Sequence, residues 1–173
     1  MFMNLPPPWR KKVSEQMIYS SIIAYLHFMA AFGVVLSVTY QWVTFDRSLT
    51  LLDARRIQKA DIIYGISAGS VLVFGYLRLF YFEKGSDYYF GDSFYYLKLY
   101  TFALVGIIST YPTIRFWKWR KITKAGNPPI IEEKEFVITR WILRVEVIGL
   151  LIMILAASMM AKGVGYSFFD GNQ

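Results

Sequence analysis

The chain contains no cysteine and only one histidine, His27. Both facts limit the metal sites, cofactors and nucleophiles that the protein can use. Without cysteine there is no disulfide, no thiolate nucleophile, no iron–sulfur cluster and no sulfur-bound zinc. A single histidine cannot ligate one haem from both sides within a subunit. The sequence also lacks an internal repeat and a phosphate-binding loop, which excludes repeat architectures and the usual nucleotide sites.

Hydrophobic residues, by contrast, make up 55% of the 173 residues, and aromatic residues 18%. A membrane-spanning helix needs about 20 predominantly apolar residues. Segments 17–43, 61–82, 94–115 and 136–161 meet or approach that length, and the connections between them are too short for a soluble domain. The sequence therefore predicts an all-α integral membrane four-helix bundle, a single transmembrane domain over residues 1–173.

The formal net charge of +7 is spread between the apolar segments and not over one basic surface, so nucleic acid is not the expected partner. Segments 44–60 and 115–135, which share one side of a four-span protein, carry ten basic residues against five on the other side. The positive-inside rule therefore predicts a multi-pass membrane protein with both basic connections in the cytoplasm and both termini outside. The lipid bilayer is its expected environment, with tryptophans such as Trp119 at the interfaces.

Ionisable residues inside the predicted spans are the candidates for function, because each costs about 2.5–3.5 kcal/mol at the bilayer centre on insertion scales. The candidate site residues are His27, Arg78, Lys98 and Glu146. Arg78 and Lys98 lie about four residues from the outer ends of their helices, where a long side chain can also reach the headgroups by snorkelling. Arg140 and Arg144 are expected to be interface anchors on the cytoplasmic side.

The depths of His27 and Glu146 predict that the two side chains meet. At 1.5 Å per residue, each lies roughly 15 Å from the expected end of its helix, near the middle of the bilayer. A carboxylate beside the imidazole would offset the burial of both groups and select the tautomer of the ring.

Three roles are open to the buried imidazole. It could bind the iron of a haem. The haem would then be five-coordinate, or take Lys98 or a methionine as its sixth ligand, or be shared with the histidine of a second subunit. Arg78 and Lys98 would then bind the propionates or another anionic head group. His27 could instead relay protons with Glu146, or simply join neighbouring helices by a hydrogen bond.

The phrases "AYLHFMAAF", "LRLFYFEKGSDYY", "STYPTIRFWKW" and "MAKGVGY" carry a family resemblance. Over about residues 20–166 the chain resembles a bacterial family of four-helix membrane proteins that is defined as a domain of unknown function. It is more distantly similar to the membrane protoporphyrinogen oxidase of the HemJ type, a compact haem-binding protein. That similarity would make His27 in "YLHFMA" and Lys98 in "FYYLK" counterparts of the histidine and lysine of that family.

Two functions of different classes follow. The first is a membrane protein whose outer half holds a polar site linked to haem or another redox cofactor. The second is a non-enzymatic accessory or assembly subunit that contacts a membrane-protein partner, or a second copy of itself, through the small-residue pattern Gly65-xxx-Gly69. A small transporter ranks below both, since the sequence lacks the repeats and broken helices of many carriers.

Overall fold

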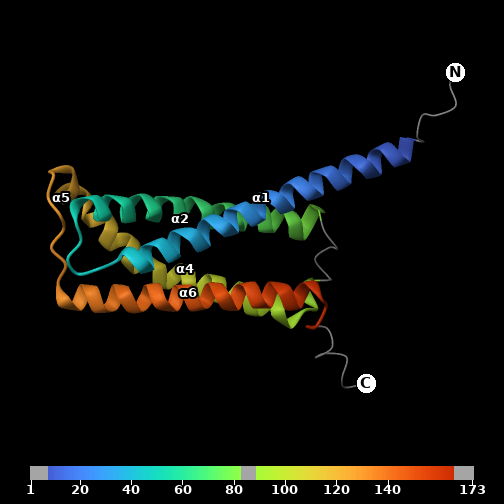
Figure 1. Ribbon diagram of the computed structural model, residues 1–173. Helices are drawn as coiled ribbons and strands as arrows, with labels where there is room; N and C mark the ends of the chain where they lie inside the picture. The colour runs from blue at the N-terminus through green and yellow to red at the C-terminus, as the bar shows by residue number, and fades with distance from the viewer. Residues whose placement is uncertain (1–7, 83–88, 166–173) are drawn as a thin grey trace.

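The computed structural model describes residues 8–82 and 89–165, with the side chains of residues 8–13 excepted, and every element in these ranges is helical (Figure 1). The elements are α1 (Pro8–Thr44), α2 (Leu51–Leu77), the π-helical segment η1 (Arg78–Phe82), α4 (Ser93–Lys118), α5 (Arg120–Lys124) and α6 (Glu133–Ala161). Four helical stretches of 29 to 32 residues are long and apolar enough to span a membrane. The predicted fold class is thereby confirmed.

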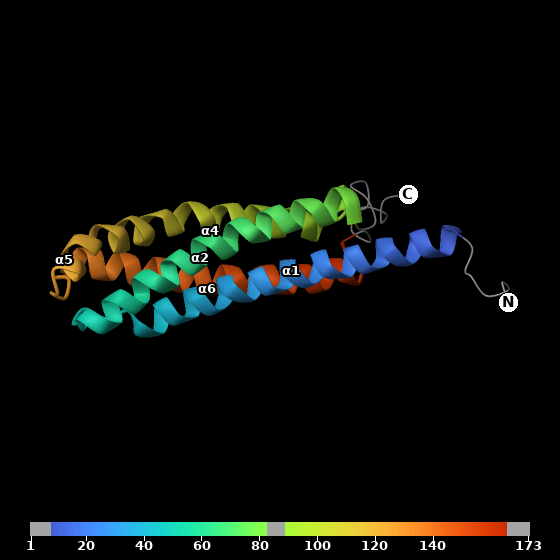
Figure 2. The same cartoon turned by 90° about the horizontal axis from the view of Figure 1, so that it is seen from above.

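The long helices associate as two pairs. Helix α1 packs along α2, and α4 packs along α6, with a smaller contact between α1 and α6 (Figures 1 and 2). We call the end of the bundle with α5 and the turn at 45–50 the α5 end, and the end with η1 and the start of α4 the η1 end. The first part of α1 projects beyond the bundle at the η1 end.

The predicted connection 44–60 is wrong in its extent, because α2 already begins at Leu51. Thr50 caps the helix: its hydroxyl accepts from the Asp53 amide at 3.1 Å and donates to the Asp53 carboxylate at 2.6 Å. Such a reciprocal cap stabilises a helix start. The basic residues that follow therefore lie on the first turns of α2 and not in a loop.

The connection before α6 begins at a glycine and leads into an acidic helix start. The chain leaves α5 through Gly126, which has a φ of +88°, a value that glycine adopts without strain. Glu133 and Glu135 then occupy the first turn of α6, where acidic side chains complement the helix dipole.

An aromatic cluster closes the α5 end. The ring of Phe45 stacks on Trp119 with a centroid distance of 6.3 Å and on Phe136 at 5.6 Å, and Phe116 completes the cluster. Trp119 is only 5% exposed, so its ring faces the interior of the bundle and not the lipid. Its indole nitrogen donates to Glu135 at 3.2 Å, which satisfies the one polar atom of the buried ring.

Close contacts between helices of this chain occur at Gly33 and Gly149. A Cβ at Gly33 would clash with the Ser67 side chain, and one at Gly149 would stand 2.5 Å from Val105 Cγ2. These positions hold α1 against α2 and α4 against α6. A Cβ at Gly65 or Gly69 would meet nothing within 4 Å, so the predicted close-packing motif packs against no described part of this chain.

Candidate functional site

His27 is half-buried between α1 and α2. The imidazole has a hydrogen bond with the backbone of Val71. The ring also lies against Gly75, where a Cβ would stand 3.3 Å from Cε1 and 3.6 Å from Nδ1. Among the described residues Nδ1 has no hydrogen-bond partner. The histidine ring therefore packs against the backbone of α2, at the position where Gly75 has no side chain.

The two predicted cations lie near this imidazole. Arg78 opens the π-helical segment η1, and its Cζ atom is 5.1 Å from the ring centre of Phe28. Lys98 on α4 places Nζ 5.7 Å from the ring centre of Tyr95. Both cations are close enough to His27 to interact with it electrostatically. The structure therefore brings three of the four predicted site residues together, beside a π-helical turn of the kind often found at functional sites.

Glu146 lies elsewhere, and its predicted contact with His27 is wrong. The carboxyl group is 1% exposed, and its electrostatic neighbours are Asp61 and Tyr64 of α2. Counted from the stacked rings of Phe45 and Phe136, His27 is about 27 Å along α1 and Glu146 about 15 Å along α6. The two residues are thus separated by about 12 Å along the bundle.

The sequence-based depth of His27 was too great because α1 extends past the bundle. Ser20 donates a hydrogen bond of 2.8 Å to the carbonyl of Phe82, the last residue of η1, so Ser20 is level with the η1 end. His27 is only seven residues, or about 10 Å, further in. Helix length alone does not say where along a helix its neighbours end.

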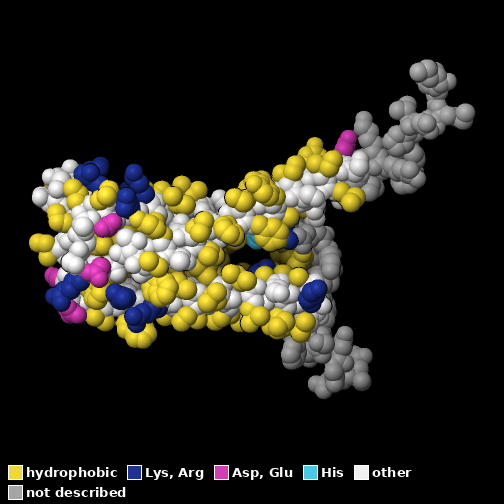
Figure 3. Space-filling view, viewed as in Figure 1, with side chains coloured by type: hydrophobic (Ala, Val, Ile, Leu, Met, Phe, Trp, Pro, Cys, Tyr) yellow, Lys and Arg dark blue, Asp and Glu magenta, His cyan; other side chains and the backbone are white. Residues whose placement is uncertain are grey.

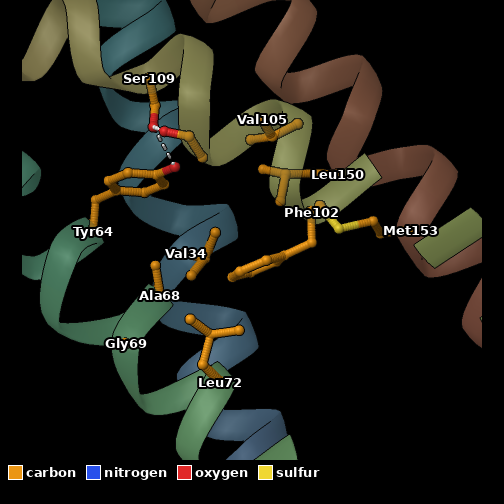
Figure 4. Close-up of a pocket in the computed structure, with 11 residues that line it drawn as sticks. Val34, Tyr64, Ala68, Gly69, Leu72, Phe102, Val105, Ser109, Leu150 and Met153 are labelled. Atoms are coloured by element: carbon orange, nitrogen blue, oxygen red, sulfur yellow. Dashed lines mark hydrogen bonds between the residues drawn. The ribbon is translucent and has the colours of Figure 1, made fainter. Parts of the chain in front are cut away.

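An apolar pocket of about 220 Å³ lies in the bundle between the cationic group and Glu146 (Figure 4). Its wall includes Val34, Leu72, Phe102, Val105, Leu150 and Met153. Its floor is polar: the Tyr64 hydroxyl donates to Ser109 Oγ at 3.0 Å, and Ser109 donates to the Gly106 carbonyl at 2.9 Å. The pocket thus joins an apolar wall to a pair of hydrogen-bonded hydroxyls.

Both α2 and α4 contribute an exposed glycine to the pocket lining, Gly69 and Gly106. The hydrogen bonds between these helices lie toward the α5 end, from Gln58 to the Phe116 carbonyl, from Thr113 to Asp61 and from Tyr64 to Ser109. Toward the η1 end, Gly69 and Gly106 line the pocket with open space beyond them. Figure 3 shows a hollow between the helical pairs in this half, on the face formed by α1 and α6, with Lys and Arg side chains beside it.

Sequence reasoning missed Asp61, Tyr64 and Thr113. Asp61 stood at the first position of a predicted span, so it was not recognised as an intramembrane acid. A signal was present: Asp61 and Tyr64 are three residues apart and Ser109 and Thr113 four apart, spacings that place each pair on one helical face.

The described part of the chain contains no group of three or more histidine, cysteine or acidic residues that could hold a metal ion. Metal ligation by His27 therefore stays a prediction.

Fold and site together define a class, helical proteins with four candidate membrane spans and ionisable side chains inside the bundle. Residues 19–165 match the family described as "Predicted membrane protein (DUF2214)", and the chain belongs to that family. The resemblance drawn from the sequence is thereby confirmed. No curated protein and no solved structure matches the chain, and the similarity to HemJ-type oxidases stays a prediction.

Proposed function

We propose that the protein binds an anionic amphiphile from the membrane, with its head group at His27, Arg78 and Lys98 and its chain in the pocket between α2 and α4. The observation that carries this proposal is the position of an open apolar pocket next to a group of cationic side chains.

The cations lie at the right height for a head group. Arg78 is six residues, or about 9 Å, beyond the pocket-lining Leu72, and Lys98 is four residues, or about 6 Å, before the pocket-lining Phe102. Both therefore stand between the pocket and the η1 end. A guanidinium and an ammonium bind carboxylate and phosphate oxygens through charge-assisted hydrogen bonds, which are roughly twice as strong as neutral ones.

The pocket suits a hydrocarbon chain. Its volume of about 220 Å³ is below the roughly 300–1,000 Å³ of sites that enclose a whole small molecule. A chain that enters from the lipid between α2 and α4 needs only part of its length enclosed. Branched and aromatic side chains line the wall, and the Tyr64–Ser109 hydroxyls limit how far an apolar group can enter.

Haem is a second candidate ligand, favoured by one observation: His27 Nδ1 has no protein partner among the described residues. The two carboxylates of haem would suit Arg78 and Lys98. The ring, however, lies against Gly75 at the tight contact between α1 and α2, and His27 does not line the pocket. We therefore place the amphiphile between α2 and α4 and treat iron ligation as a separate question.

The accessory-subunit function has its own support. Gly65 and Gly69 are exposed on α2, and a Cβ at either position would meet no described atom within 4 Å. Small residues on an open helical face allow a partner helix to approach closely. A stoichiometric membrane-protein partner after chemical crosslinking would favour this function.

Photocrosslinking tests the amphiphile site. The protein in lipid nanodiscs is exposed to a diazirine-bearing fatty acid, illuminated, and digested for mass spectrometry. We expect adducts concentrated on pocket residues of α2 and α4, and fewer adducts when Arg78 and Lys98 are both changed to glutamine. Arg56→Gln, an exposed cation near the α5 end, is the matched control.

A second pair of variants tests whether a side chain at the pocket opening blocks binding. Gly69→Leu places a side chain at the pocket opening, whereas Gly65→Leu places one on the same helix outside the pocket lining. Only Gly69→Leu should suppress the adducts. Adducts spread evenly over the exposed helices, or equal labelling of both variants, would refute the site. Haemin added to the same nanodiscs tests haem: a shifted Soret band that is lost in His27→Ala would establish iron ligation.

A further inference from the structure

Buried polar side chains lie in the interior of the bundle between the pocket and the α5 end, beside the apolar residues of the aromatic cluster. Buried polar side chains come from all four long helices: Ser37 and Gln41 on α1, Gln58 on α2, Ser109 on α4, and Thr139 and Glu146 on α6. Burying polar groups in a membrane protein is costly unless they have partners or a function.

Glu146 is the most costly member of this set. It is 1% exposed, and its Oε1 atom has no hydrogen-bond partner. Within the described residues no arginine or lysine forms an ion pair with it. The ionisable groups that face it are Asp61 and Tyr64 on α2, and Asp61 is held by a 2.8 Å hydrogen bond from Thr113.

The basic residues of neighbouring elements are directed to other groups. Arg140 and Arg144, on α6 itself, stack on Phe136 and Trp141 at 5.5 and 5.3 Å. Arg115 of α4 lies 3.7 Å from Glu135, and Arg120 of α5 interacts with Asp61. The side chains of α1 and α4 that are buried near this level, such as Ser37 and Ser109, carry no charge.

An isolated carboxylate in such an interior carries a large desolvation cost, which binding one proton removes. We infer that Glu146 is an intramembrane proton-binding site that exchanges its proton through the buried polar groups on its α5 side. The step is a simple transfer: the carboxyl O–H bond breaks, the proton passes to water, and the carboxylate remains. This site is independent of the proposed amphiphile site.

The direction of exchange follows from two more unpartnered polar atoms. Thr139 Oγ1 and Gln41 Nε2 are buried and have no hydrogen-bond partner. Thr139 is seven residues closer than Glu146 to the start of α6, and Gln41 is four residues from Phe45 in the aromatic cluster, so both lie between Glu146 and the α5 end. On the other side of Glu146, the pocket wall is apolar.

Infrared spectroscopy of the protein in nanodiscs tests the inference. A pH titration should reveal the C=O stretch of a protonated carboxyl group, which moves to lower frequency in D₂O. The band should be lost in Glu146→Gln, shifted in Glu146→Asp, and kept in Glu135→Gln, the control on the same helix. Thr139→Val should keep the band but slow its response to D₂O.

Three results would overturn the inference. The first is the absence of a protonated-carboxyl band in the native protein, and the second is a band that is the same in Glu146→Gln and Glu146→Asp. The third is loss of the band at constant pH when sodium chloride replaces choline chloride, which would identify a sodium site. Because Glu146→Asp keeps a carboxyl group, it decides the matter even if Glu146→Gln does not fold. None of these measurements requires a bound amphiphile.

Discussion

Gly149 of α6 lies so close to Val105 of α4 that a Cβ at Gly149 would stand 2.5 Å from Val105 Cγ2. Both residues are buried, and Val105 also lines the pocket. The contact lies immediately next to the turn of α6 that carries Glu146. It therefore sets the separation of α4 and α6 beside both proposed sites.

Gly149→Ala should destabilise the protein by about 1–3 kcal/mol, because the valine is branched at Cβ and cannot turn away without strain. Thermal unfolding in detergent micelles measures the loss. Gly106→Ala is the control, since its Cβ would meet nothing within 4 Å, and it should be neutral or stabilising. Val105→Ala in the same chain should relieve the clash, and a double variant no more stable than Gly149→Ala would contradict the geometry.

His27→Ala and Glu146→Ala should lower stability additively. The two residues are about 12 Å apart along the bundle and share no partner, and changes at such distances usually add within about 0.3–0.5 kcal/mol. A double-mutant cycle in micelles measures this. Asp61 and Thr113, joined by a 2.8 Å hydrogen bond, are the positive control and should show a coupling of about 0.5–3 kcal/mol. Strong coupling between His27 and Glu146 would mean that the helices are displaced from the arrangement described here.

Gln58→Met should lower the free energy of unfolding by about 1–3 kcal/mol, although methionine has a similar size and is more hydrophobic. The amide of Gln58 donates to the Phe116 carbonyl at 3.0 Å, near the end of α4, and accepts from Thr123 Oγ1 at 3.1 Å. Its removal leaves the Phe116 carbonyl without this buried donor, whereas Thr123 keeps a 3.3 Å hydrogen bond to the Arg120 carbonyl. Ser70→Ala, which removes a hydrogen bond within α2 only, should change the unfolding temperature little and serves as the control.

Cysteine labelling tests the proposed orientation, since the chain has no cysteine of its own. In intact spheroplasts a membrane-impermeant maleimide should label Lys162→Cys at the η1 end and not Asn127→Cys at the α5 end. The physical reason is the excess of basic residues at the α5 end, which the positive-inside rule places in the cytoplasm. Labelling of Asn127→Cys alone would reverse the orientation.

The sequence by itself determined the four helices and the bulk of their bounds. Long apolar runs cannot satisfy their backbone in lipid except as helices, so composition and length suffice for that inference. It also singled out His27, Arg78, Lys98 and Glu146, because ionisable groups in apolar runs stand out without any knowledge of neighbours.

Only the tertiary structure decided which of these residues meet. His27 joins Arg78 and Lys98, whereas Glu146 joins Asp61 and Tyr64, because α1 projects past the bundle and shifts its register against α6. Hydropathy records how far a helix extends and says nothing of where its neighbours begin. The pocket likewise arises from the separation of α2 and α4 near Gly69 and Gly106, a distance between helices that packing sets and no single segment of sequence encodes.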